Sequence, residues 1–282
     1  MLNRIAIVVP TLGERSELIH LVNFCLDNEL LISIADQSTS GVQFPREITE
    51  NTNLIIEHLS RRGASYGRNI AINNLPSDVD FAFTLNDCSI PNLCFIEESI
   101  RLFDLFPEVY AIGGIYLYRN GARASGKTGF LSGADVSSVI EPGMIMRVHN
   151  LETGYLFNTR LGPGANSLLQ SGEVTELLYR AIRSGKKVLM LNRIASTDFR
   201  ERPVHSIVVD FKYGVSFGVV HNCNGNRRYV LLRILSPLVR KFLGMPKGDS
   251  PVKLMNLIAI CAGRLFSLLI PNCFAARVWD IR

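Results

Sequence analysis

The N-terminal part of the chain alternates short runs of Val, Ile and Leu with longer stretches in which apolar residues recur at helical spacing. The short runs predict strands, and the helical spacing predicts amphipathic helices between them. The predicted strands cover residues 5–10, 31–35, 81–85, 109–115 and 187–191, and the predicted helices cover residues 16–28, 66–74 and 174–184. This alternation is typical of a mostly parallel sheet with helices on its faces, so we expect an α/β fold.

The pattern changes beyond about residue 200, where strand signals fade and two helical stretches follow at residues 228–244 and 252–270. Pro237 is expected to kink or break the first of them, because proline lacks the backbone donor that a helix needs. The second has a wide apolar face beside one stripe made of Lys253, Asn256, Ile260, Arg264 and Ser267. We therefore expect two regions, an α/β domain at 1–210 and a basic, apolar helical region at 211–282.

Charge is unevenly distributed along the chain, which has a net charge of +5 and a mean hydropathy of +0.19. Residues 212–282 carry eleven Lys and Arg against two Asp, so the residues before them carry a net charge of −4. A basic and apolar region is suited to an anionic membrane face. Nucleic-acid binding would need stacking aromatics among the basic residues, where this chain has mostly Leu, Ile and Val, so we expect no nucleic-acid partner.

The apolar face of residues 252–270 can be covered by the α/β domain or by lipid. Residues 254–276 are long enough to cross a bilayer, but Arg264 lies near their centre, where an arginine costs about 2.5–3.5 kcal/mol. We therefore expect peripheral association with the membrane surface. The first residues read as a strand and not as a signal peptide, which places the protein in the cytoplasm, on the inner face of the membrane.

Polar residues directly follow the predicted strands, where an open parallel sheet binds its ligands. The strand ends carry Pro10, Thr11 and Glu14, then Asp36, and then Asn86 and Asp87. Asp36 can accept hydrogen bonds from a base or ribose, although a turn-forming aspartate fits its loop as well. Arg68 can neutralise a diphosphate, and the alternative is a solvated helix residue.

The order of these segments resembles the family-two, inverting glycosyltransferases of the GT-A fold. The matching segments are IAIVVPTLGERSEL, LISIADQSTSG, RRGASYGRNIAINNL, FTLNDCSIP, LFNTRLGPGANSLLQSGEVTELLYRAIRSGKKVLML and VHSIVVDFKYGVSFGV. They are similar to the family's first two strands, its "aRN" helix, its D-x-D segment, its acceptor region and its helix preceded by a histidine. The resemblance implies a GT-A, Rossmann-like, mostly parallel sheet flanked by helices, with a helical, membrane-proximal C-terminal extension.

The resemblance also implies roles for individual residues. Those expected to hold the nucleotide-diphosphate sugar donor are Pro10, Thr11, Glu14, Asp36, Arg68, Asn86 and Asp87. Asp87 would also face a divalent cation, Mg²⁺ or Mn²⁺, with His205 as a further ligand. Glu173 would lie on the acceptor side and act as the general base that removes the proton from the attacking hydroxyl.

The sequence departs from the family pattern in two places. Asn86 and Cys88 replace the outer acids of the D-x-D segment, which leaves the Asp87 carboxylate, and a thiolate is a poor ligand for Mg²⁺ or Mn²⁺. The aspartate usually credited with base catalysis aligns with Val174. Glu173 and, one helical turn on, Glu176 are therefore the two candidates for the catalytic base.

The resemblance implies transfer of a sugar to a lipid-linked or glycan acceptor in surface polysaccharide synthesis. The sequence also allows two alternative functions. A Walker A pattern, GARASGKT at residues 121–128, would indicate an NTPase or kinase if it opened directly into a helix, but the residues after it read as a loop. The replacements at Cys88 and Val174 favour a non-catalytic GT-A module that binds a nucleotide sugar or a partner enzyme.

Overall fold

The structure, a computed structural model, describes residues 2–13, 17–121, 123–124, 127–149, 156–201, 205–242 and 254–270. In these residues ten strands form one mixed sheet in the order β3-β2-β1-β4-β9-β6-β10-β5, with β7 beside β6 and β8 beside β10. The strands are β1 (Ile5–Thr11), β2 (Leu31–Asp36), β3 (Leu54–His58), β4 (Phe81–Thr84), β5 (Ser89–Pro91), β6 (Val109–Leu117), β7 (Arg123–Ala124), β8 (Gly129–Leu131), β9 (Met144–Arg147) and β10 (Lys187–Asp198).

The sheet is parallel over its N-terminal half, as the strand–helix alternation predicted. Strands β3, β2, β1 and β4 all run in one direction, and β6 and β10 are parallel to each other. The short strand β9 lies between β4 and β6 and runs antiparallel to both. Because β1 and β4 are parallel neighbours, their carboxyl ends meet at one edge of the sheet, where ligands of such sheets bind.

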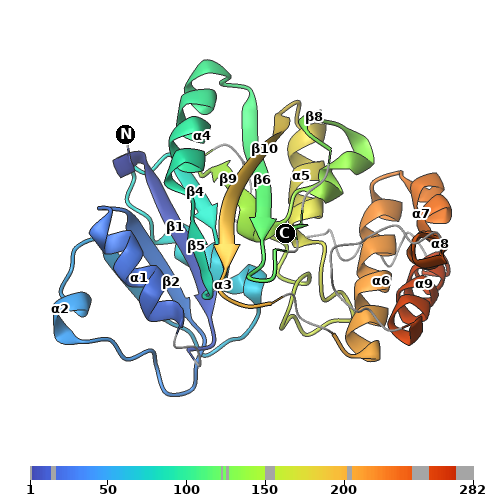
Figure 1. Cartoon of the computed structure of the whole chain (residues 1–282), viewed down its shortest axis with the longest axis horizontal. Coiled ribbons are helices and arrows are strands. Elements are labelled where there is room, and N and C mark those ends of the chain that lie inside the picture. The colour runs from blue at the N-terminus through green and yellow to red at the C-terminus, as the bar shows by residue number, and fades with distance from the viewer. Residues whose placement is uncertain are drawn as a thin grey trace.

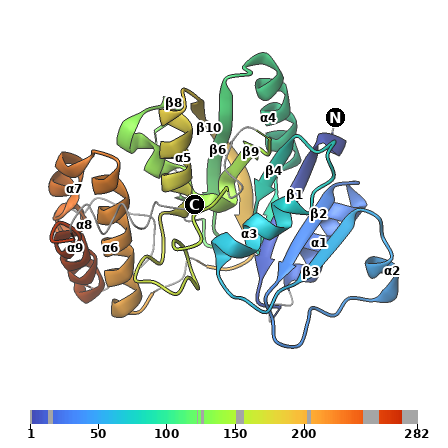
Figure 2. The ribbon, with the colours of Figure 1, turned by 180° about the vertical axis from the view of Figure 1, so that it is seen from behind.

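Helices cover both faces of this sheet, and a further group of helices lies at the C-terminal end of the chain. The helices of the described residues are α1 (Glu17–Asp27), α2 (Arg46–Thr49), α3 (Ala64–Asn73), α4 (Leu93–Leu105), α5 (Glu173–Arg183), α6 (Ile207–Cys223), α7 (Arg227–Arg233), α8 (Ser236–Phe242) and α9 (Leu254–Ser267). Helices α1 and α4 lie on one face (Figure 1), and α3 and α5 lie on the other (Figure 2). A hydrophobic core lies on each face of the sheet. Ile7 of β1 belongs to the core beneath α1 and α4, and the adjacent Val8 belongs to the core beneath α3 and α5, because successive side chains of a strand point to opposite faces.

The C-terminal helices stand together at one end of the molecule, beside α5 (Figure 1). Helix α7 ends at Arg233 and α8 begins at Ser236, so the break expected at Pro237 is confirmed. The boundary expected between residues 210 and 211 falls inside α6, which packs along α9. Glycines allow the two helices to approach closely, because a Cβ atom on Gly263 of α9 would collide with the carbonyl oxygen of Phe211 in α6.

The side of α9 that faces the protein includes polar residues of the predicted stripe together with the apolar residues Leu257 and Cys261. Asn256 and Ser267 are buried against α6, and the Asn256 amide donates to Asp210 Oδ2 at 2.6 Å and to the His205 carbonyl oxygen at 2.7 Å. Leu254, Ile258 and several other apolar side chains of the helix are exposed. Within the described residues, no helix is both long enough and apolar enough to cross a membrane.

Gly263→Ala tests the close approach of α6 and α9. A Gly-to-Ala change inside a helix ordinarily stabilises it by about 0.5–1 kcal/mol. Here the added methyl group meets the Phe211 backbone, so we expect a net loss of about 1–3 kcal/mol in the free energy of unfolding, measured by urea denaturation. The exposed neighbour Ala262 offers a matched control, because Ala262→Ser also adds one atom and should change stability by less than about 0.7 kcal/mol. Equal or increased stability of Gly263→Ala would contradict the observed packing.

Candidate functional site

One cavity of about 930 Å³ opens where the carboxyl ends of β1 and β4 meet the start of α3, the start of α5 and one side of α6. Seven of the residues singled out in the sequence line it: Pro10, Thr11, Arg68, Asn86, Asp87, Glu173 and His205. Two others, Asp36 and Glu176, are not among its lining residues, and Glu14 lies outside the described residues. The sequence positions therefore converge on one cavity, from strands, helices and loops far apart in the chain.

Asp87 and Thr11 are joined across the two parallel strands that precede them. Val8 of β1 lies opposite Thr84 of β4, so the same register brings Thr11 opposite Asp87 just beyond the paired residues. The Thr11 hydroxyl donates to Asp87 Oδ2 at 2.9 Å and accepts from the backbone of Gly13 at 3.0 Å. The Asp87 carboxylate is thus fixed in orientation at the edge of the cavity.

The metal-binding prediction can be compared with the donor atoms present. Asp87 and Asn86 both line the cavity and offer hard oxygen atoms, whereas Cys88 is fully buried and is not among the lining residues. His205 also lines the cavity, and its ring packs edge-on against Tyr213 with the ring centroids 5.0 Å apart. No group of three or more His, Cys, Asp or Glu side chains in the described ranges is arranged to hold a metal ion. The Asp87 carboxylate and the Asn86 amide oxygen could hold a divalent cation, since Mg²⁺ is commonly bound by few protein oxygens.

Arg68 is buried at the centre of the site, and is neither a solvated helix residue nor an exposed cation. Only 2% of its side chain is exposed. Its guanidinium forms an ion pair with Glu141, which lies in a short 3-10 helix, η3 (Glu141–Gly143), and Arg68 Nη1 lies 3.6 Å from Glu173 Oε1. Two carboxylates from distant segments therefore share one buried guanidinium.

Glu141 was not among the predicted site residues, yet it lines the cavity beside Arg68 and Glu173. Burial raises the pKa of Glu141 to about 7, and the nearby negative charge of Glu173 adds to this, while Arg68 opposes it. The crowding of two acids around one cation resembles the pairs of coupled carboxylates found at catalytic sites. No sequence spacing marks this glutamate, because only the folded sheet brings η3 next to α3.

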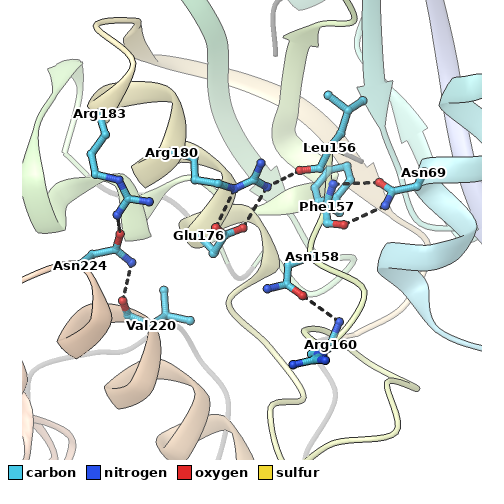
Figure 3. Close-up of polar contacts among 10 residues, drawn as sticks. All are labelled: Asn69, Leu156, Phe157, Asn158, Arg160, Glu176, Arg180, Arg183, Val220 and Asn224. Carbon is cyan, nitrogen blue, oxygen red and sulfur yellow. Dashed lines mark hydrogen bonds and ion pairs between the residues drawn. The ribbon is translucent and has the colours of Figure 1, made fainter. Parts of the chain in front are cut away.

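The structure distinguishes the two candidate bases. Glu173 lies at the first position of α5 and lines the cavity, and Gly162, in the loop that leads to α5, lies against its carboxyl group. Glu176 is 1% exposed and is held by Arg180, with contacts of 2.7 Å from Nε to Oε1 and 3.0 Å from Nη2 to Oε2. Figure 3 shows this pair on the inner side of α5, where Arg180 also donates to the Leu156 carbonyl oxygen. Of the two, Glu173 is the one placed to meet a ligand.

Helix α3 holds the loop that leads to α5. The Asn69 side chain exchanges two hydrogen bonds of 2.8 Å with the backbone of Phe157, as Figure 3 shows. The Ser65 hydroxyl donates to the Leu161 carbonyl oxygen at 2.7 Å, and the Ala64 backbone donates to Pro163 at 2.9 Å. The polar side chains of this helix are buried because they form hydrogen bonds with backbone groups of the loop, which would otherwise be buried without partners.

Asp36 fits the turn-forming alternative that its loop sequence allowed. It is fully buried, and its carboxylate accepts from the backbones of Ser38 at 2.9 Å and Val42 at 2.7 Å and contacts His58 Nδ1 at 2.8 Å. Burial alone would raise the pKa of Asp36, but these hydrogen bonds together hold it below its ordinary value. The neighbouring Gln37 does line the cavity, and its amide donates to the carbonyl oxygens of Arg61 and Gly63.

A second charged group at the cavity, absent from the predictions, is Arg200 beside Asp198. Arg200 lines the cavity and contacts both oxygens of Asp198, at 3.1 Å from Nε and 3.2 Å from Nη2. Asp198 also accepts from the Tyr116 hydroxyl, which holds the carboxylate beneath the cavity. Burial lowers the pKa of Arg200 and the bonds to Asp198 more than offset this, so its pKa is raised and it carries a permanent positive charge.

The Walker A pattern does not have the structure that phosphate binding requires. Its described residues include β7 (Arg123–Ala124), and Thr128 leads directly into β8 (Gly129–Leu131) instead of a helix. Lys127 is largely exposed and pairs with Asp135 at 2.8 Å. A P-loop needs a helix N-terminus behind its glycines, so this segment does not support an NTPase or kinase.

Glu141→Gln tests the crowded arrangement around Arg68 through its pH dependence. Because the pKa of Glu141 is raised in the folded state from 4.5 to about 7, the folded protein binds more protons than the unfolded protein in that window. Wild-type stability therefore falls as pH rises through the window. The variant lacks this loss, so its free energy of unfolding relative to wild type should rise by on the order of 1–3 kcal/mol from about pH 5 to about pH 8.

Glu108→Gln is the control for this pH series, measured by the same urea denaturation. Hydrogen bonds from its own backbone and from Lys187 lower the pKa of the exposed Glu108 from 4.5, so its contribution to stability changes only below about that pH. The stability of this variant relative to wild type should therefore stay level from about pH 5 to about pH 8. A relative stability of Glu141→Gln that does not depend on pH, or that falls as pH rises, would contradict the position assigned to Glu141.

Comparison with known proteins gives matches at the level of structure. Neither a family model nor a curated protein sequence matches the chain. Residues 1–349 of TarS from S. aureus match it with a TM-score of 0.56 and 15% identity, over 86% of this chain and 79% of that one. The same fragment in complex with UDP-GlcNAc matches with a TM-score of 0.56 and 14% identity, over 86% and 78%. Full TarS matches with a TM-score of 0.54 and 15% identity, over 86% and 43%. The chain thus has the α/β, GT-A fold predicted from its sequence, with a helical C-terminal part, and shares that fold with TarS.

Proposed function

We propose that the chain is an inverting glycosyltransferase, which moves a sugar from a nucleotide-diphosphate donor to a hydroxyl group of an acceptor. The observation that carries this proposal is the meeting of Thr11, Asp87 and Glu173 in one cavity at the carboxyl ends of β1 and β4. The resemblance of the sequence motifs to family-two glycosyltransferases supports it. So does the fold, because TarS, which shares it, has been crystallised with UDP-GlcNAc.

The donor is proposed to lie along the strand ends. Pro10, Thr11 and Asn86 border the nucleotide-diphosphate, and Asp87 faces the phosphates, held in place by the Thr11 hydroxyl. Asp87 and Asn86 are the oxygen ligands proposed for a divalent cation, Mg²⁺ or Mn²⁺. When bound, such an ion would neutralise negative charge on the departing diphosphate. Arg200, which lines the same cavity, adds a fixed positive charge.

Glu173 is proposed as the general base. Its carboxylate accepts the proton of the acceptor hydroxyl while the hydroxyl oxygen attacks the anomeric carbon of the donor. The bond between that carbon and the diphosphate breaks in the same step, and the nucleotide diphosphate leaves. Because the attack comes from the side opposite the leaving group, one displacement inverts the anomeric carbon. Arg68 positions the base, since its guanidinium lies 3.6 Å from the Glu173 carboxylate.

The C-terminal helices are proposed to lie on an anionic membrane surface, where a lipid-linked acceptor for surface polysaccharide synthesis would be held. Helices α7, α8 and α9 and the residues that flank them expose a set of large apolar side chains: Leu231, Leu232, Leu235, Val239, Leu254, Met255, Ile258, Leu265, Phe266 and Leu269. Arg227 and Arg228 are exposed at the start of α7, and residues 212–282 are strongly basic. Apolar side chains beside basic ones are what an interfacial helix presents to anionic lipid.

Glu173→Gln should lower sugar transfer by about 10²–10⁴-fold, because glutamine keeps the shape of the side chain but cannot accept the proton. The assay measures nucleotide release from UDP-, GDP- and dTDP-sugars in the presence of a membrane-lipid extract, with and without Mn²⁺. The donor that supports release is then titrated by calorimetry, and Glu173→Gln should bind it as tightly as wild type does. Asp87→Ala, in contrast, should weaken donor binding.

Glu176 provides the matched control, one turn along the same helix. The pair of substitutions Glu176→Gln and Arg180→Gln removes both members of the buried ion pair, so neither charge is left unpaired. This variant should melt at a lower temperature but should retain turnover within about tenfold of wild type. Equal loss in both variants would contradict Glu173 as the base. If the protein bound a donor but released nucleotide from none, the non-catalytic module would be favoured. The replacement of the usual catalytic aspartate by Val174 would then explain the missing turnover.

Membrane association is tested by sedimentation with vesicles. The double variant Leu232→Glu and Leu269→Glu changes two side chains that are 81% and 75% exposed on α7 and beyond α9. It should bind vesicles of anionic phosphatidylglycerol at least about tenfold more weakly than wild type, because two apolar contacts with lipid are lost. Leu105→Glu, at a 70% exposed leucine on α4, should bind as wild type does. Equal weakening in both variants, or equal binding to neutral phosphatidylcholine, would contradict this surface.

A further inference from the structure

One side of α6 contributes an aromatic surface to the cavity. Tyr213, Phe217 and His221 are spaced by four residues, and all three line the cavity. Four-residue spacing places side chains one above another on the same side of a helix. We call these three residues the α6 aromatic face.

The α6 aromatic face begins directly beside the proposed base. Gly172 precedes Glu173 with a φ of +92°, and a Cβ atom there would lie 2.9 Å from the Val220 side chain, so α6 packs directly on the start of α5. Tyr213 and Glu173 both line the cavity, and burial and then the negative charge of Glu173 raise the pKa of Tyr213 to about 12. On the other side of Glu173, Arg68 follows Gly67, which packs on Pro10 at the end of β1. Glu173 therefore stands between the strand ends and the α6 aromatic face.

Neighbouring groups fix the rings of this face. The guanidinium of Arg264 lies 4.3 Å from the centre of the Phe217 ring, and Phe217 and His221 have their ring centres 4.3 Å apart. Tyr229 packs behind His221 at 4.8 Å. Rings that are already ordered lose little conformational freedom when a ligand binds, so the surface is preorganised.

One ring nitrogen of His221, Nε2, has no hydrogen-bond partner among the described residues. The other, Nδ1, lies 2.7 Å from the Tyr179 hydroxyl, which also accepts from the Asn226 amide at 3.0 Å. Burial lowers the pKa of His221 to about 4, so the ring is neutral, and Nε2 donates in one tautomer and accepts in the other. The Nε2 atom is buried, and a sugar hydroxyl can satisfy it in either tautomer, because a hydroxyl both donates and accepts.

We propose that the α6 aromatic face is an acceptor subsite that binds a pyranose ring. This inference rests on the proposed function and names the class of acceptor, a glycan whose sugar ring packs on Phe217 and whose hydroxyl group forms a hydrogen bond with His221 Nε2. The C–H bonds on one face of a pyranose carry partial positive charge, which suits the negative face of an aromatic ring. A buried polar nitrogen beside these rings suits a sugar and not a hydrocarbon chain, which would leave the nitrogen without a partner.

The test is saturation-transfer NMR with three defined probes, methyl β-D-glucopyranoside, methyl β-D-galactopyranoside and methyl N-acetyl-β-D-glucosaminide. Open-chain glucitol, which has hydroxyl groups but no ring, is the control compound. At least one pyranoside should receive saturation on the C–H protons of one ring face. Phe217→Leu, which keeps the apolar volume, should reduce that signal by about fivefold or more, and Phe217→Trp should retain it.

Phe211→Leu is the matched control variant, because Phe211 is an aromatic residue of the same helix that packs on Phe266 and does not line the cavity. It should leave the signal unchanged. Equal signals from glucitol and the pyranosides, or equal effects of the two Leu variants, would overturn the subsite. Calorimetry with the nucleotide-sugar donor distinguishes this failure from that of the proposed function, since Phe217→Leu should bind the donor as wild type does. Pyranoside binding without any donor binding would instead overturn the transferase and keep the sugar subsite.

Discussion

The candidate site depends on the burial of one positive charge. Arg68 of α3 is buried, and a buried guanidinium is unfavourable unless carboxylates compensate it. Glu141 and Glu173 provide that compensation, and each comes from a segment that also lines the cavity. The two acids neutralise Arg68, and the same ion pairs fix the positions of Glu141 and Glu173. A carboxylate held in this way, with limited freedom to turn, is suited to accept a proton at one defined place.

The parts of the site that lie on strands could be predicted from the sequence, and the parts that lie on loops could not. Thr11 and Asp87 were identified because each directly follows an apolar run, and parallel strands end at the same edge of a sheet. The burial of Arg68 could not be read from its helix, whose polar residues look solvent-facing until Asn69 and Ser65 are seen to bond the loop. Glu141 is invisible to spacing arguments, because η3 approaches α3 only once β9 pairs between β4 and β6.

The C-terminal helices show a different limit of pattern analysis. The break at Pro237 follows from proline chemistry alone, and it is present between α7 and α8. The amphipathic pattern of α9 correctly gave two faces but not which one the protein covers. Glycines on α6 and α9 bring the backbones together, so the contact is made by small and polar residues such as Asn256 and Ser267. Leu257 of α9 is buried, but other large apolar side chains such as Ile258 and Leu265 remain exposed, while Tyr213 and Phe217 of α6 line the cavity. An exposed apolar surface and a surface that lines the cavity are thereby built on one group of helices.

The most direct test of the account is hydrogen–deuterium exchange of the whole chain, with and without the nucleotide sugar that gives nucleotide release. Donor binding at the proposed site should slow exchange of backbone amides at residues 8–13, 62–68 and 84–88, which surround the ends of β1 and β4 and the start of α3. Residues 121–131, which contain the Walker A pattern, should exchange at an unchanged rate. Slower exchange at residues 121–131 with no change at the strand ends would contradict the central claim that this cavity binds the donor.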